Sequence, residues 1–349
     1  MSVERPDLSG LPADVIAYIE ALEEKLQGIR AVTPATRPAS LPDEPPSAHA
    51  IITVSRNGLI KRTPRHLYGR QRRGGMGVFD LDVPEGDEPA QLAHAAAADI
   101  LILLTDDGRA FRLPVSALAE SPVRARGHDL REMLSLRPNE RIVGLLPEGG
   151  GQFVILVSQR GWVRRVLASY LGKNLIPGTT FHDLKEGGPL VAACWSAGEN
   201  DLFLASREGK AIRFMERQVP GRGCLGIRLD PTDAAVGVAA VGPTDGVFLL
   251  GDDGQGTIRL MSGFAANKAP AAGGKVAMKV DRLVGAARVS SGDELFLISR
   301  MGKLIRFAAD EIPSKEGVVQ GVGCMLLRAD EAVALTVAVG SGLLQTTAD

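Results

Sequence analysis

Short apolar runs alternate with tight polar turns along most of this 349-residue chain. Each apolar run leads into a turn that ends in Gly, and a basic residue follows a few positions later. Glycine accepts the positive φ of tight hairpin turns, so each copy predicts two antiparallel strands. The six copies are Val54–Arg62, Leu103–Arg112, Leu156–Arg165, Leu204–Arg213, Leu249–Arg259 and Leu297–Arg306. Successive turn glycines lie 45 to 53 residues apart, at Gly58, Gly108, Gly161, Gly209, Gly254 and Gly302.

A third apolar stretch follows each hairpin and predicts a third strand. In the first copy, Ala93–Asp99 is rich in Ala and favours a helix by propensity, but its place in the repeat favours a strand, which we adopt. Strand repeats of this period are typical of propeller-like arrays, in which each sheet needs its neighbours to bury its faces. The other third strands are Ile142–Leu146, Leu190–Ala193, Val236–Val241, Leu283–Val289 and Val333–Val337. The sequence predicts an all-β, propeller-like array of six repeats with a short N-terminal helix.

Residues 1–31 lie outside the repeat and predict one amphipathic helix. We expect it either to pack on its own domain or fray in solvent, or to pair with a second copy as a homodimer. Its apolar stripe follows a 4-3-4-3 spacing at Val15, Ile19, Leu22, Leu26 and Ile29. A Pro-rich linker at 32–49 is expected to be extended and largely unstructured. The six-repeat domain then covers 50–340, and a tail covers 341–349.

The formal net charge of −1 conceals an uneven distribution. Residues 1–50 carry four basic and eight acidic residues, whereas residues 51–80 carry seven basic residues and one acidic residue, Asp80. A local patch of one sign matters to a polyanion more than the total charge does. This stretch therefore favours a nucleic acid as the partner.

Other features of the sequence give no indication of a metal, cofactor or membrane. The cysteines (Cys194, Cys224 and Cys324) show no metal or disulfide spacing, and the five histidines are scattered. No apolar run approaches the roughly 20 residues of a membrane span, and no basic-plus-apolar leader opens the chain. We expect a cytoplasmic protein that uses no cofactor.

A Gly-rich basic segment, GRQRRGGMG, follows the second strand of the first repeat at Gly69–Gly77. Arg72 and Arg73 supply guanidinium forks suited to phosphate oxygens, and Gln71 can donate without adding charge. Gly74, Gly75 and Gly77 let a nucleic-acid backbone approach main-chain N–H groups. Nothing here reads bases, so we expect salt-sensitive phosphate contacts. A compatible alternative is that this loop closes the array by joining the first and last sheets.

The heptapeptide QRRGGMG (Gln71–Gly77) resembles the box QRRGGKG of the C-terminal domain of the bacterial DNA gyrase A subunit, at six of seven positions. GCLGIRL (Gly223–Leu229), GKVAMKV (Gly274–Val280) and the six hairpins also fall where that family has them. The resemblance, shared with the topoisomerase IV A subunit, covers 50–340. It implies a six-bladed β-pinwheel that bends or wraps duplex DNA and influences supercoiling, as a free-standing chain or as part of a longer one. Met76 replaces the lysine of the box, which should weaken wrapping.

Basic residues four positions after the turn glycines predict an electrostatic track around the rim, at Arg62, Arg112, Arg165, Arg213 and Arg306. Arg259 breaks this register. The alternative is that these side chains occupy solvated strand faces. Lys61, Arg65 and Arg70, from the basic stretch, complete the predicted DNA-binding set.

By the resemblance, the expected partners are double-stranded DNA and gyrase or topoisomerase subunits, at the bacterial nucleoid. Type IIA topoisomerases cut DNA with a tyrosine next to an arginine, but no Arg precedes Tyr18, Tyr68 or Tyr170. We therefore expect a non-catalytic chain. Two alternatives stay open: a protein-interaction propeller that has lost DNA wrapping, and an accessory subunit of a type IIA topoisomerase complex.

Overall fold

The computed structural model describes Pro12, residues 14–20 and residues 44–340. The chain divides into two compact units, Met1–Pro42 and Asp43–Asp349. In the first unit, residues 14–20 are helical, as expected there. Leu22, Leu26 and Ile29, linker residues 32–43 and the tail lie outside the described residues, so pairing through the helix stays a prediction. Within the described residues, no helix is long and apolar enough to cross a membrane.

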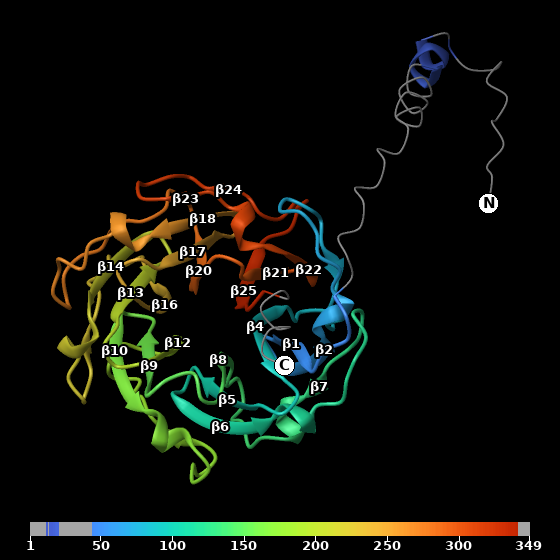
Figure 1. The fold of residues 1–349 in the computed structure, drawn as a ribbon. Helices are drawn as coiled ribbons and strands as arrows, with labels where there is room; N and C mark the ends of the chain where they lie inside the picture. The colour runs from blue at the N-terminus through green and yellow to red at the C-terminus, as the bar shows by residue number, and fades with distance from the viewer. Residues whose placement is uncertain (1–11, 13, 21–43, 341–349) are drawn as a thin grey trace. The chain divides into compact units, whose positions relative to one another are not determined.

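The second unit is a ring of six mainly antiparallel sheets, here called blades 1 to 6 in chain order (Figure 1). The first hairpin strands are β1 (His49–Ser55), β5 (Ile100–Thr105), β9 (Phe153–Ser158), β13 (Asp201–Ser206), β17 (Gly246–Gly251) and β21 (Glu294–Ser299). The second hairpin strands are β2 (Leu59–Pro64), β6 (Arg109–Pro114), β10 (Trp162–Leu167), β14 (Lys210–Met215), β18 (Gln255–Leu260) and β22 (Lys303–Ala308). All six predicted hairpins are therefore confirmed.

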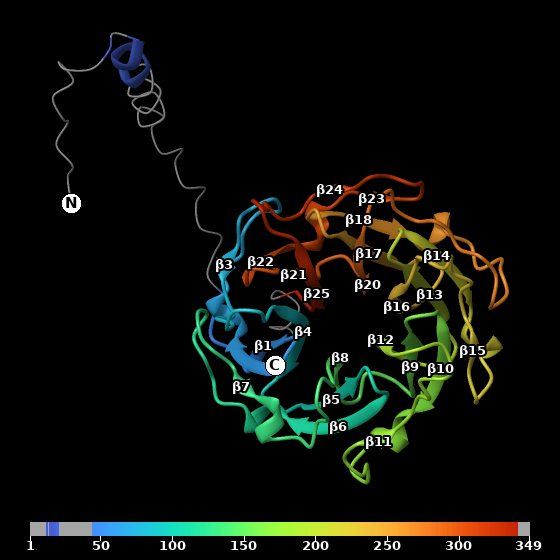
Figure 2. The same cartoon turned by 180° about the vertical axis from the view of Figure 1, so that it is seen from behind.

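The third strand of each repeat pairs with the first strand and lies nearest the centre of the ring (Figure 2). These inner strands are β4 (Pro89–Ala96), β8 (Ile142–Pro147), β12 (Leu190–Ser196), β16 (Ala235–Val241), β20 (Leu283–Val289) and β25 (Ala332–Ala338). The Ala-rich stretch of the first repeat is thus a strand, as its place in the repeat predicted. The resulting architecture is the predicted all-β ring of six blades.

A short outer strand completes each blade, and no pattern in the sequence predicted it. The outer strands are β3 (Val78–Phe79), β7 (His128–Asp129), β11 (Thr179–Thr180), β15 (Cys224–Leu225), β19 (Lys275–Val276), β23 (Ser314–Lys315) and β24 (Val322–Gly323). Each one comes from the segment after the second strand of the next blade, so β7 pairs with β2 and β11 with β6. β3 of blade 1 pairs with β22 of blade 6, which closes the ring.

The hydrophobic core is divided into clusters between neighbouring blades. One cluster joins Ile52 and Val54 of β1 to Leu101 and Leu103 of β5, and all four side chains are buried. A 3₁₀ turn follows each second strand and helps to cover these clusters: η1 (Arg65–Leu67), η2 (Val115–Ala117), η4 (Ala168–Leu171), η5 (Glu216–Gln218), η6 (Met261–Gly263) and η7 (Ala309–Glu311). A further 3₁₀ turn, η3 (Leu130–Glu132), follows β7. The blades therefore stabilise one another through shared side-chain layers.

Candidate nucleic-acid interface

The Gly-rich basic segment lies where blade 1 meets blade 6. The Gln71 N–H donates to the Arg306 carbonyl oxygen at 2.8 Å, and the Gly74 N–H donates to the Cys324 carbonyl oxygen at 2.7 Å. The Leu326 N–H in turn donates to the Gly75 carbonyl oxygen at 2.9 Å. Since β3 follows directly and pairs with β22, this segment closes the ring. The predicted closing role is confirmed.

The glycines of this segment are required by its own packing. A Cβ atom at Gly77 would lie 2.6 Å from the Leu304 carbonyl oxygen, and the φ of +72° also favours glycine. A Cβ atom at Gly75 would lie 2.6 Å from Gln71 Oε1. A glycine precedes an outer strand in every blade, at Gly77, Gly127, Gly178, Gly223, Gly274 and Gly321. Gly77 therefore serves the blade repeat itself.

The main-chain N–H groups of these glycines are already engaged. Gly74 donates to Cys324, Gly75 donates to the Arg72 carbonyl oxygen at 3.3 Å, and Gly77 donates to Gln71 Oε1 at 3.3 Å. The prediction that a nucleic-acid backbone uses these N–H groups is therefore wrong for this structure, because ring closure occupies them. The side-chain oxygen Oε1 of Gln71 is therefore engaged within the segment as well.

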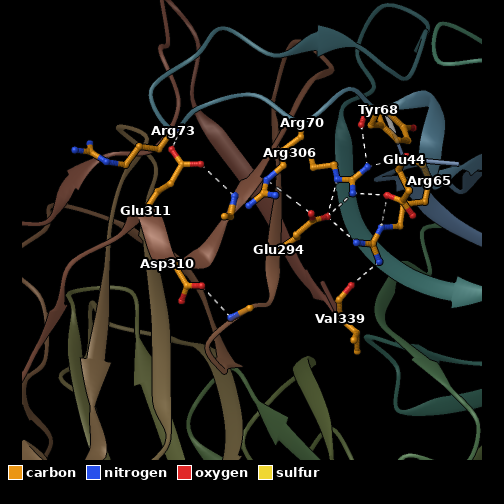
Figure 3. Close-up of polar contacts among 12 residues, drawn as sticks. Glu44, Arg65, Tyr68, Arg70, Arg73, Glu294, Arg306, Asp310, Glu311 and Val339 are labelled. Atoms are coloured by element: carbon orange, nitrogen blue, oxygen red, sulfur yellow. Dashed lines mark hydrogen bonds and ion pairs between the residues drawn. The ribbon is translucent and has the colours of Figure 1, made fainter. Parts of the chain in front are cut away.

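The side chains of Arg72, Arg73 and Met76 are exposed, and Met76 reaches 51% exposure. The Arg73 guanidinium donates to the Gly323 carbonyl oxygen at 3.2 Å. The main-chain N–H of Arg73 donates to Glu311 at 2.9 Å (Figure 3). Arg70 is partly exposed, with its Nε 3.9 Å from Glu294 Oε1. These guanidinium groups remain accessible to an anionic ligand.

Four of the predicted DNA-binding residues are at most 5% exposed and paired, which corrects the prediction. Lys61 and Arg65 are 0% exposed, Arg306 is 3% exposed and Arg213 is 5% exposed. A side chain enclosed in this way cannot reach a phosphate group. Their carboxylate partners are Asp80 for Lys61, Glu294 for Arg65 and Arg306, and Asp201 for Arg213.

The other three arginines of the predicted track also pair with carboxylates. Arg62 is 9% exposed and lies 2.8 Å from Glu120. Arg112 lies 2.5 Å from Glu148, and Arg165 lies 3.6 Å from Glu216; both side chains keep about a fifth of their exposure. The repeated arginines are therefore neither an open electrostatic track nor solvated strand faces.

Several of these arginines tie one blade to the next. Arg62 donates to the carbonyl oxygen of Leu118, which ends the 3₁₀ turn of blade 2, at 3.2 Å. Arg213 donates to the carbonyl oxygens of Met261 and Phe264 in blade 5, at 2.7 and 2.9 Å. The sequence repeat thus marks an inter-blade contact. Its fixed distance from the turn glycine was the available signal, because a surface charge needs no fixed register.

A buried cluster fixes the end of the Gly-rich segment. The Lys61 ammonium contacts the Asp80 carboxylate and donates to the carbonyl oxygens of Asp80 at 2.7 Å and Val123 at 2.5 Å. The hydroxyls of Thr53 and Tyr68 also donate to the Asp80 carboxylate. Burial lowers the pKa of Lys61 and raises the pKa of Tyr68 well above its ordinary value, and the nearby Asp80 carboxylate raises the pKa of Tyr68 further. The cluster therefore joins the segment that follows β2, through Asp80, to the segment that follows β6, through Val123. We call these segments, which carry the outer strands, outer segments.

A second buried cluster joins the ends of the ring (Figure 3). Glu294 Oε2 lies 2.6 Å from Arg65 Nη2 and accepts from Arg306 Nε at 2.7 Å. Glu44 contacts both arginines, and its side chain is only 6% exposed. Arg65 also donates to the Val339 carbonyl oxygen at 2.6 Å. Glu44 falls in the stretch expected to be an unstructured linker, so that prediction is wrong at this residue, because its charge balances two buried arginines.

The surface charge of this region is smaller than the residue count suggested. Lys61 and Arg65 are neutralised internally, and Arg56 pairs with Glu88 at 2.8 Å. Two exposed arginines outside the predicted set, Arg124 and Arg126, flank Ala125 in the segment between β6 and β7.

Hydrogen bonds place the segment around Ala125 beside the chain that follows the Gly-rich segment Gly69–Gly77, here called the box segment. The Ala125 N–H donates to the Asp80 carbonyl oxygen at 3.2 Å, and the Asp82 N–H donates to the Ala125 carbonyl oxygen at 3.0 Å. We call the exposed set the basic arc: Arg70, Arg72, Arg73, Arg124 and Arg126. The spacing of VRARG in the second repeat was the signal for its last two members.

A closed ring of six blades that exchange outer strands defines a β-pinwheel. Four segments, 49–88, 99–147, 200–241 and 293–315, match the family described as DNA gyrase C-terminal domain, beta-propeller. These matches, together with the relatives below, confirm the predicted resemblance: the chain folds as a β-pinwheel similar to the DNA gyrase A C-terminal domain.

The relatives that the chain matches are DNA gyrase A subunits. The chain is 28% identical over 295 residues to the DNA gyrase A subunit of Escherichia coli (strain K12), which covers 81% of this chain and 34% of that protein. It is 28% identical over 291 residues to the DNA gyrase A subunit of Mycolicibacterium smegmatis (strain ATCC 700084 / mc(2)155), with coverage of 79% and 34%. The chain thus spans about a third of the length of these relatives.

Solved structures share the fold. A DNA gyrase A C-terminal domain matches with a TM-score of 0.73 at 20% identity, over 83% of this chain and 100% of that chain. A C-terminal domain of DNA topoisomerase IV matches with a TM-score of 0.61 at 18% identity, over 86% and 98%.

Proposed function

We propose that this chain binds duplex DNA along the outer edge of the pinwheel and bends or wraps it, and so contributes to DNA supercoiling. The observation that carries the proposal is the basic arc, whose guanidinium groups lie on adjacent outer segments and face solvent. Guanidinium forks match phosphate oxygens. Bending a duplex costs several kcal/mol over a few tens of base pairs, which phosphate contacts spread along an edge can offset.

The proposed role is non-catalytic. The alignments cover about a third of the length of the matched relatives, and the family match is to a C-terminal domain type. We therefore assign DNA cleavage, where it accompanies bending, to a gyrase or topoisomerase partner. This role belongs in the bacterial cytoplasm, at the nucleoid.

The test measures binding of random-sequence duplex DNA between about 50 and 200 mM salt, because phosphate contacts predict a steep loss of affinity over that range. A relaxed plasmid treated with this protein and a nicking-closing enzyme then reports bending or wrapping as a change in linking number. A chain that binds no duplex at low salt is the protein-interaction propeller instead. Binding without any change in linking number would leave DNA binding and remove wrapping.

A further inference from the structure

One outer strand differs from the others at a position that the fold makes equivalent in every blade. Phe79 pairs with Lys303, the first residue of the second strand in blade 6. The residues in the same register are Asp129, Thr180, Leu225, Val276 and Gly323. Among these described positions the aromatic side chain occurs at Phe79. The register itself accepts an acid, a hydroxyl, an aliphatic side chain or no side chain, so the blade does not require a phenyl ring there.

Phe79 is 49% exposed, although burying an aromatic side chain away from water lowers the free energy of the protein. Its neighbours along the chain, Met76 and Val78, are 51% and 40% exposed, and Met301 of the adjacent hairpin turn is 54% exposed. Phe79 and Met301 line a hollow of about 150 Å³ together with Leu81, Asp82, Val83 and Arg124. We call Phe79 and Met301, which share this hollow, the apolar ridge.

Cations flank the apolar ridge. Lys303 Nζ lies 5.4 Å and Arg124 Cζ lies 5.8 Å from the centre of the Phe79 ring. Arg72 and Arg73 precede the ridge on the same segment and are exposed. The surface therefore presents exposed apolar side chains with two cations close to the Phe79 ring, and the acidic residue Asp82 lines the same hollow. Its complement is a polyanion that has apolar faces between two rows of negative charge.

We propose that Phe79 is a wedge that presses between base steps of duplex DNA while the nearby cations hold the phosphates. The inference rests on the DNA binding proposed above. Apolar side chains of this kind partly unstack a base step and kink the duplex, which lowers the cost of bending it around a protein. Met76 then supplies apolar surface in place of the charge that the box lysine would add.

The test compares Phe79→Thr with a matched control, Val276→Thr. Threonine already occupies the equivalent register at Thr180, so the substitution fits the outer strand. Val276 is 43% exposed at the same register of another blade. The measurements are the bend of an end-labelled duplex by energy transfer, the affinity for that duplex across salt concentrations, and the affinity for the same duplex with a central mismatch.

We expect the wild-type chain to prefer the mismatched duplex by roughly tenfold, because a mismatch removes part of the unstacking cost. Phe79→Thr should lose that preference and bend DNA less, while its salt slope stays unchanged because every phosphate-binding cation is kept. Val276→Thr should behave as wild type, and Phe79→Trp should keep the bend and the preference.

The contrary results are distinct. If Phe79→Thr binds, bends and discriminates as wild type does, or if Phe79→Trp bends no better than Phe79→Thr, the wedge is overturned while DNA binding stands. If the wild-type chain binds no duplex, the proposed function itself fails and the apolar ridge is left for an acidic protein segment, which also overturns the wedge.

Discussion

Arg306 of β22 donates a hydrogen bond to the carbonyl oxygen of Tyr68, 3.1 Å away and 238 residues earlier in the chain. The contact joins blade 6 to the 3₁₀ turn of blade 1, as Arg213 joins blade 4 to blade 5. The same guanidinium group contacts Glu294 and Glu44. Closure of the ring therefore combines the pairing of β3 and β22 with a buried ion-pair cluster, next to the segment that carries Arg72 and Arg73.

Arg306→Ala should destabilise the folded chain by about 3–5 kcal/mol, because it leaves buried carboxylates without part of their balancing charge. Chemical denaturation measures the free energy of unfolding. Arg300→Ala is the control: Arg300 pairs with Glu331 at 2.8 Å but its side chain is 47% exposed, so the expected loss is below about 1 kcal/mol. Equal losses for the two variants would contradict a special role for the closing cluster.

The burial of His94 leads us to expect that the folded chain loses stability at mildly acidic pH. Its ring stacks on His49 with centroids 4.9 Å apart, and its Nε2 lies 3.3 Å from Arg65 Nη1. Burial, with the positive charge of Arg65, lowers the pKa of His94 from 6.5 to about 3. As the pH falls below 6.5, the unfolded chain takes up this proton before the folded chain does. The contribution to stability is therefore complete above pH 6.5 and is lost progressively toward pH 3.

Urea denaturation at pH 7 and pH 5 tests this dependence. The wild-type chain should lose more unfolding free energy between these values than His94→Gln, by at most about 1.4 kcal/mol per pH unit. His128→Gln is the control, because His128 is exposed on β7. This variant should lose as much unfolding free energy between the two pH values as the wild-type chain does. Parallel losses in all three chains would mean that carboxylates, rather than His94, set the acid sensitivity.

The hairpins could be predicted from sequence because their determinants are local. An apolar run such as Phe153–Ser158 and a turn glycine such as Gly161 specify a strand and its reversal without reference to the rest of the chain. The outer strands carry no such pattern. β3 and β7 are two residues long and pair with another blade, so only the assembled ring defines them.

The candidate site was predicted in part, for a related reason. The charge balance of residues 51–80 predicted that Lys61 and Arg65 lie on the surface. Their carboxylate partners, Asp80 and Glu294, lie 19 and 229 residues away in the sequence, so the pairing was not visible there. Arg72 and Arg73 were placed correctly on the surface, since a Gly-rich segment gives their side chains no core to enter. The purpose of the glycines was misassigned, because the sequence cannot show that Leu304 approaches Gly77.

Replacement of both Arg72 and Arg73 by Ala should weaken duplex binding and reduce the salt slope by about two units, one for each phosphate group that is no longer neutralised. The unfolding free energy should change by less than about 1 kcal/mol, because both side chains are exposed. The paired substitution Arg160→Ala and Arg207→Ala is the control, since it removes the same charge from hairpin turns. A large loss of stability with unchanged binding would make the two arginines structural.

Met76→Lys should increase the supercoiling constrained per bound protein, because it restores the charge of the gyrase box. Met76 is 51% exposed, so the substitution removes no core packing. We expect the salt slope to rise by about one unit and affinity to gain on the order of 1 kcal/mol or less, since the site stays open to water. The readout is the linking-number change at equal occupancy. Val276→Lys adds the same charge at another exposed outer strand and separates general attraction from a contact at position 76.

The two lysine variants also bear on how the box meets DNA. If both gain affinity equally and neither constrains more supercoiling, the added charge acts at long range and position 76 does not lie on the DNA path. If Met76→Lys alone constrains more, the phosphate backbone passes over the box segment. In that case the side chain of residue 76 sets a balance between apolar contact, which Met supplies beside Phe79, and phosphate contact, which Lys supplies beside Arg72 and Arg73.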